Sequence, residues 1–415
     1  MHNEAPAASD TSKPAARGKS AGDRLPLVVY ILAAGTFLML TTEFVIAGIL
    51  PEIAGDLDIS LAQAGSLITV FAVGMVIGAP LLALLTMRLS KKLTLLIALV
   101  VFVAGHVIVA LSSDLTILMG ARFITALATG AFWAVSAVVA SNMVGPSLKS
   151  SAVGVVAAGG SLATVLGVPI GAFLAQHVGW RGTFWALGIA AAIAVVFIAR
   201  LVPADAPQPK GASVLGGLAD LRSPRLWLVL AACLTTTGGV LAAYSFVTPI
   251  LTDQAGVTPA LVPLVLAGFG ICSFLGTLLG GRLGDKHAHA VVIVTPALTT
   301  LVLAAMAVFT GSTWTTVTLV VLLGAFGLSA NSVLIHLAVG HAGRAETLGS
   351  GLAVAAFNGG TAIGTTIAGT TLTSGLGLSG PATVGAIIVA LTLIPTIILA
   401  TLARRHRTAE PVSSH

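Results

Sequence analysis

Charged side chains are scarce in this chain of 415 residues. Asp, Glu, Lys and Arg together make up 8% of the sequence, whereas hydrophobic residues make up 56% and the mean hydropathy is +1.04. Soluble domains carry roughly 25% charged residues, because their surfaces must be hydrated. The composition therefore excludes a soluble globular protein and predicts a polytopic membrane protein.

Cysteine is almost absent as well. Cys233 and Cys272 both lie inside apolar runs, which excludes a disulfide framework. His287 and His289 have no further His or Cys nearby, so we expect no metal site and no cofactor. The sequence also lacks a Walker-type Gly-x-x-x-x-Gly-Lys-Ser/Thr loop, which argues against ATP-driven transport. No polar stretch is long enough for a catalytic domain, and we expect a protein that is not an enzyme.

Long apolar runs dominate what is present. A membrane-spanning helix needs about 20 apolar residues, and polar or Gly/Pro-rich breaks cut the sequence into twelve such runs. They cover approximately residues 27–50, 61–87, 93–111, 116–141, 149–175, 183–202, 225–251, 260–281, 290–310, 314–338, 348–373 and 381–403. The sequence thus predicts an all-α protein with twelve transmembrane helices. Residues 1–25 are polar and are expected to form a disordered cytoplasmic tail, followed by an uncleaved first helix.

The formal charge of +6 comes from 20 basic and 14 acidic residues. If the N-terminus is cytoplasmic, every basic residue except Arg122 and Arg181 falls in a cytoplasmic segment. Because loops rich in Lys and Arg stay in the cytoplasm, this bias orients the chain without any need for a nucleic-acid partner. We expect a multi-pass monomer in the cell inner (plasma) membrane with both termini cytoplasmic. Its expected partners are the lipid bilayer, a small-molecule substrate and protons.

The sequence falls into two related halves. Residues 203–224 are polar and Pro-rich, and are predicted to be a cytoplasmic linker between residues 26–202 and residues 225–403. Residues 404–415 are predicted to form a second cytoplasmic tail. Three stretches recur in the same order at nearly the same offset: Leu40-Thr41-Thr42-Glu43 with Leu234-Thr235-Thr236-Thr237, Arg88-Leu89-Ser90-Lys91-Lys92 with Arg282-Leu283-Gly284-Asp285-Lys286, and Gly159-Gly160-Ser161 with Gly359-Gly360-Thr361. Such parallel repeats are typical of secondary transporters.

Several motifs carry a family resemblance. They are Thr42-Glu43-Phe44-Val45-Ile46-Ala47-Gly48-Ile49-Leu50-Pro51-Glu52-Ile53-Ala54, Phe71-Ala72-Val73-Gly74-Met75-Val76-Ile77-Gly78-Ala79-Pro80, Gly167-Val168-Pro169-Ile170-Gly171, and Gly179-Trp180-Arg181-Gly182-Thr183-Phe184-Trp185. From Leu27 to Leu402 the chain resembles the major facilitator superfamily. Within it, the chain is most similar to bacterial drug:proton antiporters of the chloramphenicol-resistance and arabinose-efflux type. The resemblance implies two pseudo-symmetric six-helix bundles around a central cavity.

The resemblance also implies gating loops after the second and eighth spans, formed by Arg88, Lys91, Arg282, Asp285 and Lys286. The family's loop motif is Gly-x-Leu-x-Asp-Arg. The second-half copy keeps its acid as Asp285, whereas the first-half copy has Lys91 in that place and no acid beside it. We therefore expect that only one of the two loops, the one with Asp285, keeps the acid that holds the gate closed. The Gly-Val-Pro-Ile-Gly stretch also differs from the antiporters' usual Gly-Pro-x-x-Gly-Gly pattern, although export remains the favoured interpretation.

Glu43 is the only one of the 14 acidic residues that lies well inside an apolar run. A charged side chain at bilayer depth costs ~2.5–3.5 kcal/mol on insertion scales, so such residues are usually functional. Desolvation favours the neutral form of a carboxylate, which allows Glu43 to take up and release protons. We expect Glu43 to be a proton carrier. The alternative is a structural acid that is bonded to a neighbouring helix.

Arg122 is the only basic residue inside a run. The stretch Leu118-Met119-Gly120-Ala121-Arg122-Phe123-Ile124-Thr125 resembles the superfamily's fourth-helix arginine motif, which implies a role in proton coupling. The alternative is an arginine that backbone carbonyls of the first helix hold in place to stabilise the bundle.

Two further sets of residues are expected around this pair. Polar and aromatic side chains inside the runs are candidates for the substrate cavity: Thr36, Met39, Thr129, Trp133, Thr237, Tyr244, Phe269, Asn331 and Asn358. His106 and His336 are expected to form hydrogen bonds between helices. Small residues at helical spacing let helix backbones approach closely, and the packing set is Gly160, Gly167, Pro169, Gly171, Gly360 and Gly364.

These features favour a proton-coupled secondary exporter (antiporter) of a small amphipathic compound, such as the drug chloramphenicol, that works by alternating access. Export of a sugar, a nucleoside or another metabolite is the alternative within transport. A membrane-embedded enzyme or sensor is a more distant alternative, because the sequence offers no converging acids or histidines. Since Thr237 stands where the repeat has Glu43, proton handling is expected in the N-terminal half.

Overall fold

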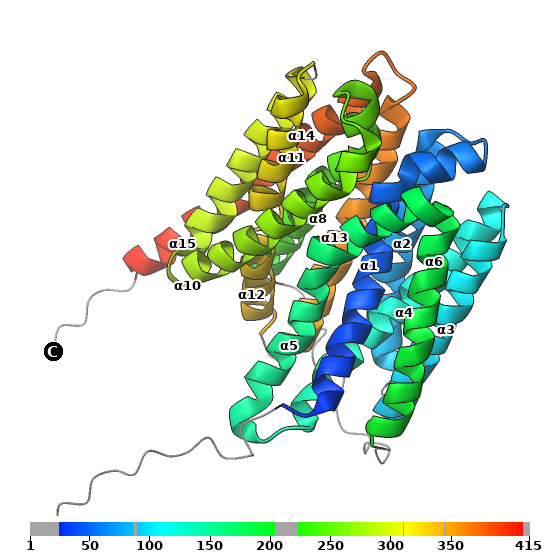
Figure 1. Cartoon of the computed structure of the whole chain (residues 1–415). Helices are drawn as coiled ribbons and strands as arrows, with labels where there is room; N and C mark the ends of the chain where they lie inside the picture. The colour runs from blue at the N-terminus through cyan, green and yellow to red at the C-terminus, as the bar shows by residue number, and fades with distance from the viewer. Residues whose placement is uncertain (1–24, 87–88, 204–222, 310, 344–345, 410–415) are drawn as a thin grey trace, which may run out of the picture.

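The computed structural model describes residues 25–86, 89–203, 223–309, 311–343 and 346–409 (Figure 1). Within these ranges every regular element is a helix. Residues 1–24 and 410–415 of the predicted tails, most of the predicted linker and Arg88 lie outside the described residues, whereas residues 404–409, predicted as part of the second tail, continue α15 (Leu393–Ala409).

The N-terminal half begins with long helices that follow the apolar runs. Three of them start at side-chain caps: the Ser60 hydroxyl accepts from the Gln63 N–H, the Ser90 hydroxyl accepts from the Leu93 N–H, and the Asp114 carboxylate accepts from the N–H groups of Thr116 and Ile117. Such caps satisfy N–H groups that have no partner in the first turn. The helices are α1 (Leu27–Asp56), α2 (Leu61–Thr86), α3 (Lys91–Leu111), α4 (Leu115–Asn142), α5 (Lys149–Leu162) and α6 (Val168–Leu201), with a 3-10 turn at Pro146–Leu148 and a π-helical turn at Ala163–Gly167.

The C-terminal half repeats this plan with more interruptions. Its helices are α8 (Pro224–Tyr244), α9 (Val247–Pro249), α10 (Val262–Val308), α11 (Thr313–Gly327), α12 (Asn331–His341), α13 (Glu346–Thr371), α14 (Gly380–Leu391) and α15 (Leu393–Ala409). A π-helical turn at Ile250–Gln254 extends α9, and 3-10 turns lie at Pro259–Leu261 and Gly377–Ser379.

Ten helical stretches of the described chain are long and apolar enough to cross a membrane. Two of them, Lys149–Leu201 and Pro259–Val308, contain 53 and 50 residues. A straight helix of that length would measure about 75–80 Å at 1.5 Å per residue, more than twice the ~30 Å of bilayer hydrocarbon. Each bends near its middle, at Gly179 (φ 76°, ψ 159°) and at His287 (φ −138°, ψ 52°), and so supplies two spans. The predicted twelve spans are therefore confirmed.

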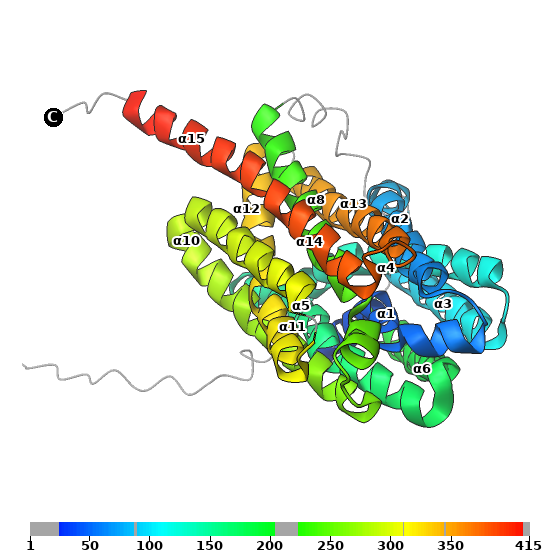
Figure 2. The ribbon, with the colours of Figure 1, turned by 90° about the horizontal axis from the view of Figure 1, so that it is seen from above.

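The spans form two bundles that lie side by side in the view from above (Figure 2). Leu32 and Phe102 belong to a core inside the N-terminal bundle, and Leu334 belongs to a core inside the C-terminal bundle. A third core contains Ile46 of the first half and Leu266 of the second, so it joins the two bundles. The predicted architecture of two six-helix bundles is confirmed.

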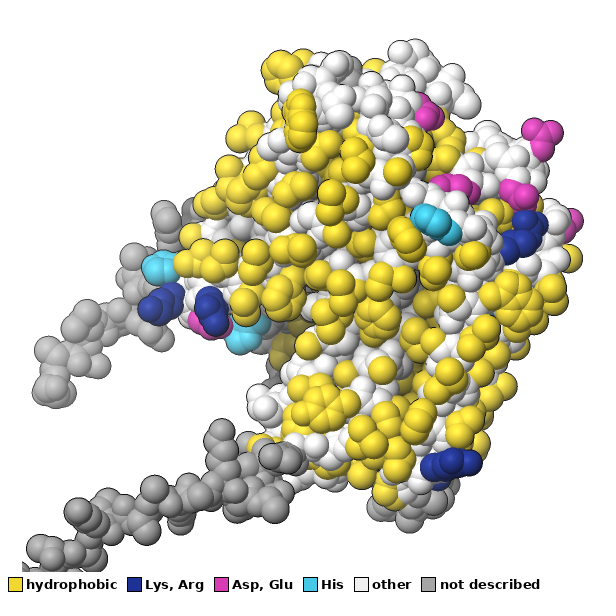
Figure 3. All heavy atoms as spheres, in the orientation of Figure 1, with side chains coloured by type: hydrophobic (Ala, Val, Ile, Leu, Met, Phe, Trp, Pro, Cys, Tyr) yellow, Lys and Arg dark blue, Asp and Glu magenta, His cyan; other side chains and the backbone are white. Residues whose placement is uncertain are grey.

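Contacts between the bundles are concentrated toward the end of the molecule at which α1 finishes. Three hydrogen bonds join described residues of the two halves there: Thr248 Oγ1 donates to the carbonyl of Ala47 (2.8 Å), Gln176 Nε2 donates to the carbonyl of Pro259 (2.7 Å), and the hydroxyls of Thr69 and Thr366 lie 3.3 Å apart. On the other side, the surface is hollowed between the two halves (Figure 3). The molecule is thus closed at one end and open toward the other.

A proline accounts for one of these contacts. Pro51 lies inside α1, and Ile49 just before it has non-helical backbone angles (φ −127°, ψ 17°). Because proline has no N–H, the carbonyl four residues earlier in a helix loses its usual donor. That carbonyl belongs to Ala47, and it accepts the hydroxyl of Thr248 from the opposite half. The interruption in α1 therefore creates an acceptor for an inter-half hydrogen bond.

We expect Thr248→Val to weaken the closed end. Valine has nearly the shape of threonine but no donor, so the Ala47 carbonyl is left without its partner. A hydrogen bond contributes about 1 kcal/mol to the state that contains it, which corresponds to roughly a fivefold change in the ratio of closed to open molecules. The distance between spin labels attached at Asp58→Cys and Thr258→Cys, in a chain without its native cysteines, measures this opening. In Thr248→Val, a larger fraction of molecules should show a long distance between the two labels.

The matched control is Thr252→Val. The Thr252 hydroxyl donates to the carbonyl of Thr248 (3.1 Å) and to Asp253 Oδ1 (2.6 Å), so its bonds stay within one half. Its distance distribution should match the wild type. An unchanged distribution in Thr248→Val would show that this bond does not hold the halves together.

Candidate functional site

Glu43 lies on α1, two turns before Pro51, and faces the opposite half of the molecule. A small pocket surrounds it, lined by Phe44 from α1, by Ile68, Phe71 and Ala72 from α2, by Leu241 from α8, and by Asn358 and Thr361 from α13. The Glu43 side chain is half-buried, and no hydrogen bond joins its carboxylate to another described residue. The predicted acid thus lines a pocket to which both bundles contribute.

Arg122 is buried on α4, with 1% of its surface exposed. Its NH1 donates to the Thr42 hydroxyl (2.8 Å), and its guanidinium carbon lies 4.1 Å from the centre of the Phe71 ring. The Nε and NH2 atoms have no hydrogen-bond partner among the described residues. The contact to α1 is therefore made to a side chain, whereas the structural alternative placed it at backbone carbonyls. Arg122 is also the charged group that acts electrostatically on Glu43.

His106 on α3 completes this cluster. Its Nε2 lies 2.9 Å from the Thr42 hydroxyl, and its Nδ1 lies 2.8 Å from the carbonyl of Phe102. The imidazole stacks on the Phe102 ring with 3.9 Å between ring centres. The predicted interhelical hydrogen bond of His106 is present, and its partner is the residue directly before Glu43.

Thr42 and Phe71 were not among the predicted site residues. The one feature of the sequence that points to Thr42 is its position directly before Glu43, the only acidic residue well inside an apolar run. Nothing in the sequence indicates that Phe71 lies under the guanidinium of Arg122 while it also lines the pocket of Glu43. That placement depends on the rotation of α2 against α1 and α4.

Among the predicted cavity residues, Asn358 shares the pocket of Glu43. Its Nδ2 donates to the carbonyl of Val354 (3.1 Å), and its Oδ1 has no partner. Thr237 is buried on α8, one turn before Leu241, and its hydroxyl has no partner either. Asn358 and Thr237 therefore each have one polar atom without a hydrogen-bond partner among the described residues, close to the boundary between the halves.

The other predicted cavity residues lie away from this pocket. In the N-terminal bundle, Thr36 donates to the carbonyl of Leu32 (2.9 Å), and Thr129 donates to the Met39 sulfur (3.5 Å), all in buried positions. The remaining members are a partly buried Trp133, a buried stack of Tyr244 on Phe269 with 4.3 Å between ring centres, and Asn331 at the start of α12.

The predicted gating residues that are described lie at one end of the molecule. Lys91 is the first residue of α3 and is partly buried. Arg282, Asp285 and Lys286 are exposed on α10, directly before its bend at His287.

The predicted packing glycines lie at helix contacts. A Cβ added to Gly160, Gly167 or Gly171 would meet side chains of α1, whereas one added to Gly360 or Gly364 would meet the backbone of α8. Pro169 is buried near the start of α6, directly after the π-helical turn. These residues set the separation of α1 from the α5–α6 segment and of α8 from α13.

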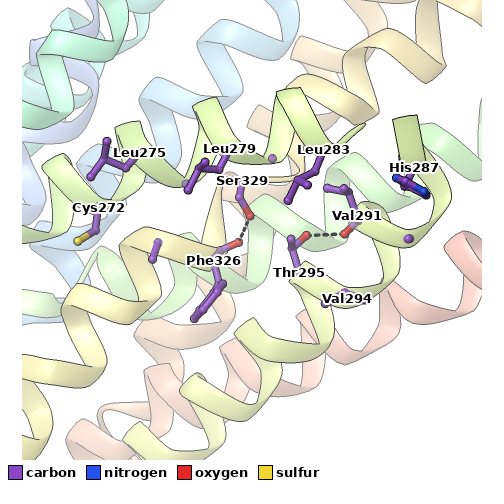
Figure 4. Close-up of a pocket in the computed structure, with 14 residues that line it drawn as sticks. Cys272, Leu275, Leu279, Leu283, His287, Val291, Val294, Thr295, Phe326 and Ser329 are labelled. Carbon is purple, nitrogen blue, oxygen red and sulfur yellow. Dashed lines mark hydrogen bonds between the residues drawn. The ribbon is translucent and has the colours of Figure 1, made fainter. Parts of the chain in front are cut away.

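A larger hollow of about 540 Å³ lies elsewhere, between the two arms of α10 and α11 (Figure 4). It is lined mainly by apolar side chains such as Leu275, Leu279 and Leu283. The Thr295 hydroxyl bonds to the carbonyl of Val291 on α10, and the Ser329 hydroxyl bonds to the carbonyl of Phe326 near the end of α11, both at 2.8 Å. This hollow includes none of the predicted coupling or cavity residues. Within the described ranges, no three His, Cys, Asp or Glu side chains gather to hold a metal ion.

The chain as a whole has clear relatives. The family model described as Major Facilitator Superfamily matches residues 32–258 and 236–415. The chain is 34% identical to the chloramphenicol resistance protein of Streptomyces lividans, over 89% of this chain and 95% of that protein. It is 32% identical to the inner membrane transport protein YdhP of Escherichia coli (strain K12), over 88% and 93%, and 32% identical to the putative transporter AraJ of the same strain, over 84% and 89%.

A solved structure shares the fold. It is a bacterial homologue of the human lysosomal transporter Spinster in an inward-facing and unoccupied conformation, with a TM-score of 0.70 at 16% identity over 90% of this chain and 95% of that one. The fold, the two halves and the family match agree, and the chain belongs to the Major Facilitator Superfamily of transporters.

Proposed function

We propose that the protein is a proton-coupled antiporter that exports a small amphipathic compound, and that Glu43 carries the proton. The observation that supports this most is the position of Glu43. Its side chain lines a pocket built by both halves and has no hydrogen-bond partner among the described residues. Because an ionisable side chain is costly to place at bilayer depth, such a group is a candidate functional residue.

Alternating access follows from the two bundles. In the described conformation the halves are joined at one end and separate at the other. With the termini in the cytoplasm, as the distribution of Lys and Arg favours, this is the state open to the cytoplasm. Protonation of Glu43 from the periplasm favours substrate release there, and loss of the proton to the cytoplasm resets the site. Proton and substrate drive the cycle only through their different affinities for the two states.

The pocket composition and a relative both favour a drug-like substrate. Phe44, Ile68, Phe71 and Leu241 give the pocket an apolar lining, with Asn358 and Thr361 as polar groups. Such a lining suits an amphipathic compound better than a sugar, which needs many hydrogen bonds. The name of the Streptomyces lividans relative adds chloramphenicol as the first compound to test.

Everted membrane vesicles from an exporter-deficient bacterial host test the proposal. With the vesicle interior acidic, chloramphenicol should accumulate inside vesicles that contain the protein, and a protonophore should abolish the accumulation. Radiolabelled arabinose, measured in parallel, should not accumulate. Accumulation of arabinose alone would support the sugar alternative, and accumulation that survives the protonophore would contradict proton coupling.

A further inference from the structure

Thr42 and His106 form a defined binding place for Arg122. The Phe102 carbonyl is only an acceptor, so the His106 Nδ1 that lies 2.8 Å from it must carry the hydrogen. In a neutral imidazole the other nitrogen is then an acceptor. The Thr42 hydroxyl therefore donates to His106 Nε2 (2.9 Å) and accepts from Arg122 NH1 (2.8 Å). In this series of three hydrogen bonds, from Arg122 to Thr42, from Thr42 to His106 and from His106 to Phe102, each hydrogen has an acceptor and the direction of each bond is fixed.

This arrangement requires a neutral His106. A protonated imidazole would direct an N–H at the Thr42 oxygen, which already accepts from Arg122, and the hydroxyl hydrogen would lose its acceptor. Two cations would also be separated by a single hydroxyl group. Arg122 is the charged group that acts on both Glu43 and His106. The other charged residues on the neighbouring helices lie at helix ends or beside a bend, as Lys91 does at the start of α3 and Arg181 does after the bend of α6 at Gly179.

Arg122 is nevertheless only partly satisfied. Its Nε and NH2 are buried without partners, although a buried guanidinium normally uses most of its donors. Glu43 follows Thr42 directly in α1, its carboxylate forms no hydrogen bond with another described residue, and Arg122 acts on it electrostatically. Phe71, which lies against the guanidinium, lines the Glu43 pocket as well. Arg122 thus has unused donors beside an unused acceptor.

We propose that Arg122 alternates between two partners, the Thr42 hydroxyl oriented by His106 when Glu43 is protonated, and the Glu43 carboxylate when it is ionised. Thr42 and His106 are positioning residues in this scheme, and they set the pH at which Glu43 takes up its proton. The inference rests on the proposed role of Glu43 as the proton carrier. No covalent step is involved: Glu43 exchanges its proton with water, and Arg122 keeps its charge throughout.

The consequence is a testable direction of change. When the Thr42 partner is removed, Arg122 spends more time beside Glu43. A positive charge beside a carboxylate favours the ionised form, so Glu43 then needs more acid to become protonated. Dicyclohexylcarbodiimide reacts with protonated carboxyl groups in apolar surroundings, and mass spectrometry of the peptide that contains Glu43 measures the fraction labelled. The assay uses the purified full chain and needs no substrate.

In Thr42→Val, the pH of half-maximal labelling at Glu43 should fall by about one unit, a tenfold change in proton concentration. His106→Leu should shift it in the same direction by less, because the hydroxyl remains but loses its orientation. The double variant should match Thr42→Val alone, since His106 acts through Thr42. Thr42→Ser keeps the hydroxyl and should restore the wild-type value.

Thr299→Val is the matched control, because it removes a buried hydroxyl that bonds only to the carbonyl of Thr295 (2.8 Å). Its labelling curve should coincide with the wild type. An unchanged or raised half-labelling pH in Thr42→Val would overturn the inference, as would additive shifts in the double variant. If Thr42→Val does not fold, an unchanged curve in His106→Leu overturns it equally. The proposed function fails separately, if Glu43→Gln retains proton-driven export.

Discussion

Uphill export should be lost in Glu43→Gln, while the protein still folds and still binds its substrate. Glutamine has nearly the same shape but is neutral at every pH, so it keeps the carrier permanently in the equivalent of the protonated form. Among the described residues the carboxylate has no hydrogen-bond partner that the change would break, and a neutral side chain is easier to place at bilayer depth than a charged one. In everted vesicles, accumulation driven by the pH gradient should fall to the level of vesicles that lack the protein.

Exchange of labelled for unlabelled substrate needs no net proton movement, and it should persist in Glu43→Gln. This separates lost coupling from lost binding. Asp58→Asn is the matched control, because Asp58 is an exposed acid outside α1 whose positive φ (52°) asparagine tolerates. It should export like the wild type. Accumulation in Glu43→Gln that still follows the pH gradient would remove Glu43 from the mechanism.

The largest effect on folding is expected for Gly364→Val. A Cβ at Gly364 would meet the carbonyl group of Gly238 on α8, and a Cβ at Gly238 would meet Gly360 on α13. Here two helix backbones touch, so no flexible side chain can move aside. Overpacking costs about 1–3 kcal/mol and sometimes more, and a contact made by backbone on both sides favours the upper part of that range. The yield of monodisperse protein and its melting temperature should both fall sharply.

Gly351→Val is the control on the same helix. A Cβ added to Gly351 meets no atom within 4 Å, so the same substitution should leave yield and melting temperature near the wild-type values. Equal losses in both variants would mean that valine in α13 is harmful by itself. Equal stability in both would mean that α8 and α13 are not as close as the structure shows.

The features that composition determines were predictable from the sequence. The lack of charge and the spacing of the polar breaks led to twelve spans in two bundles, although the bends at Gly179 and His287 merge four of these spans into two continuous stretches. Glu43 and Arg122 stood out because a charge inside an apolar run is rare. Their surroundings were not predictable, because threonines and phenylalanines occur throughout the spans.

The rotation of each helix decides which of those common residues matter. Thr42 contacts Arg122 and His106, whereas Thr36, one and a half turns earlier on α1, bonds only to its own helix. Tyr244 and Phe269 looked suited to stack on a substrate, but they stack on each other inside a core. The periodicity of one helix in the sequence does not show how that helix is rotated and shifted against its neighbours. That rotation and shift decide which residues each side chain contacts.

The carbonyl of Ala47 has a consequence for how water reaches Glu43. Ala47 lies four residues after Glu43, on the same face of α1 and one turn away. While the halves are joined, the Thr248 hydroxyl satisfies this carbonyl. When they part, Pro51 offers no N–H in exchange, and a bare carbonyl in an apolar region is costly, so water must take the place of Thr248. Opening this end therefore draws water to within one helical turn of Glu43, the proposed proton carrier.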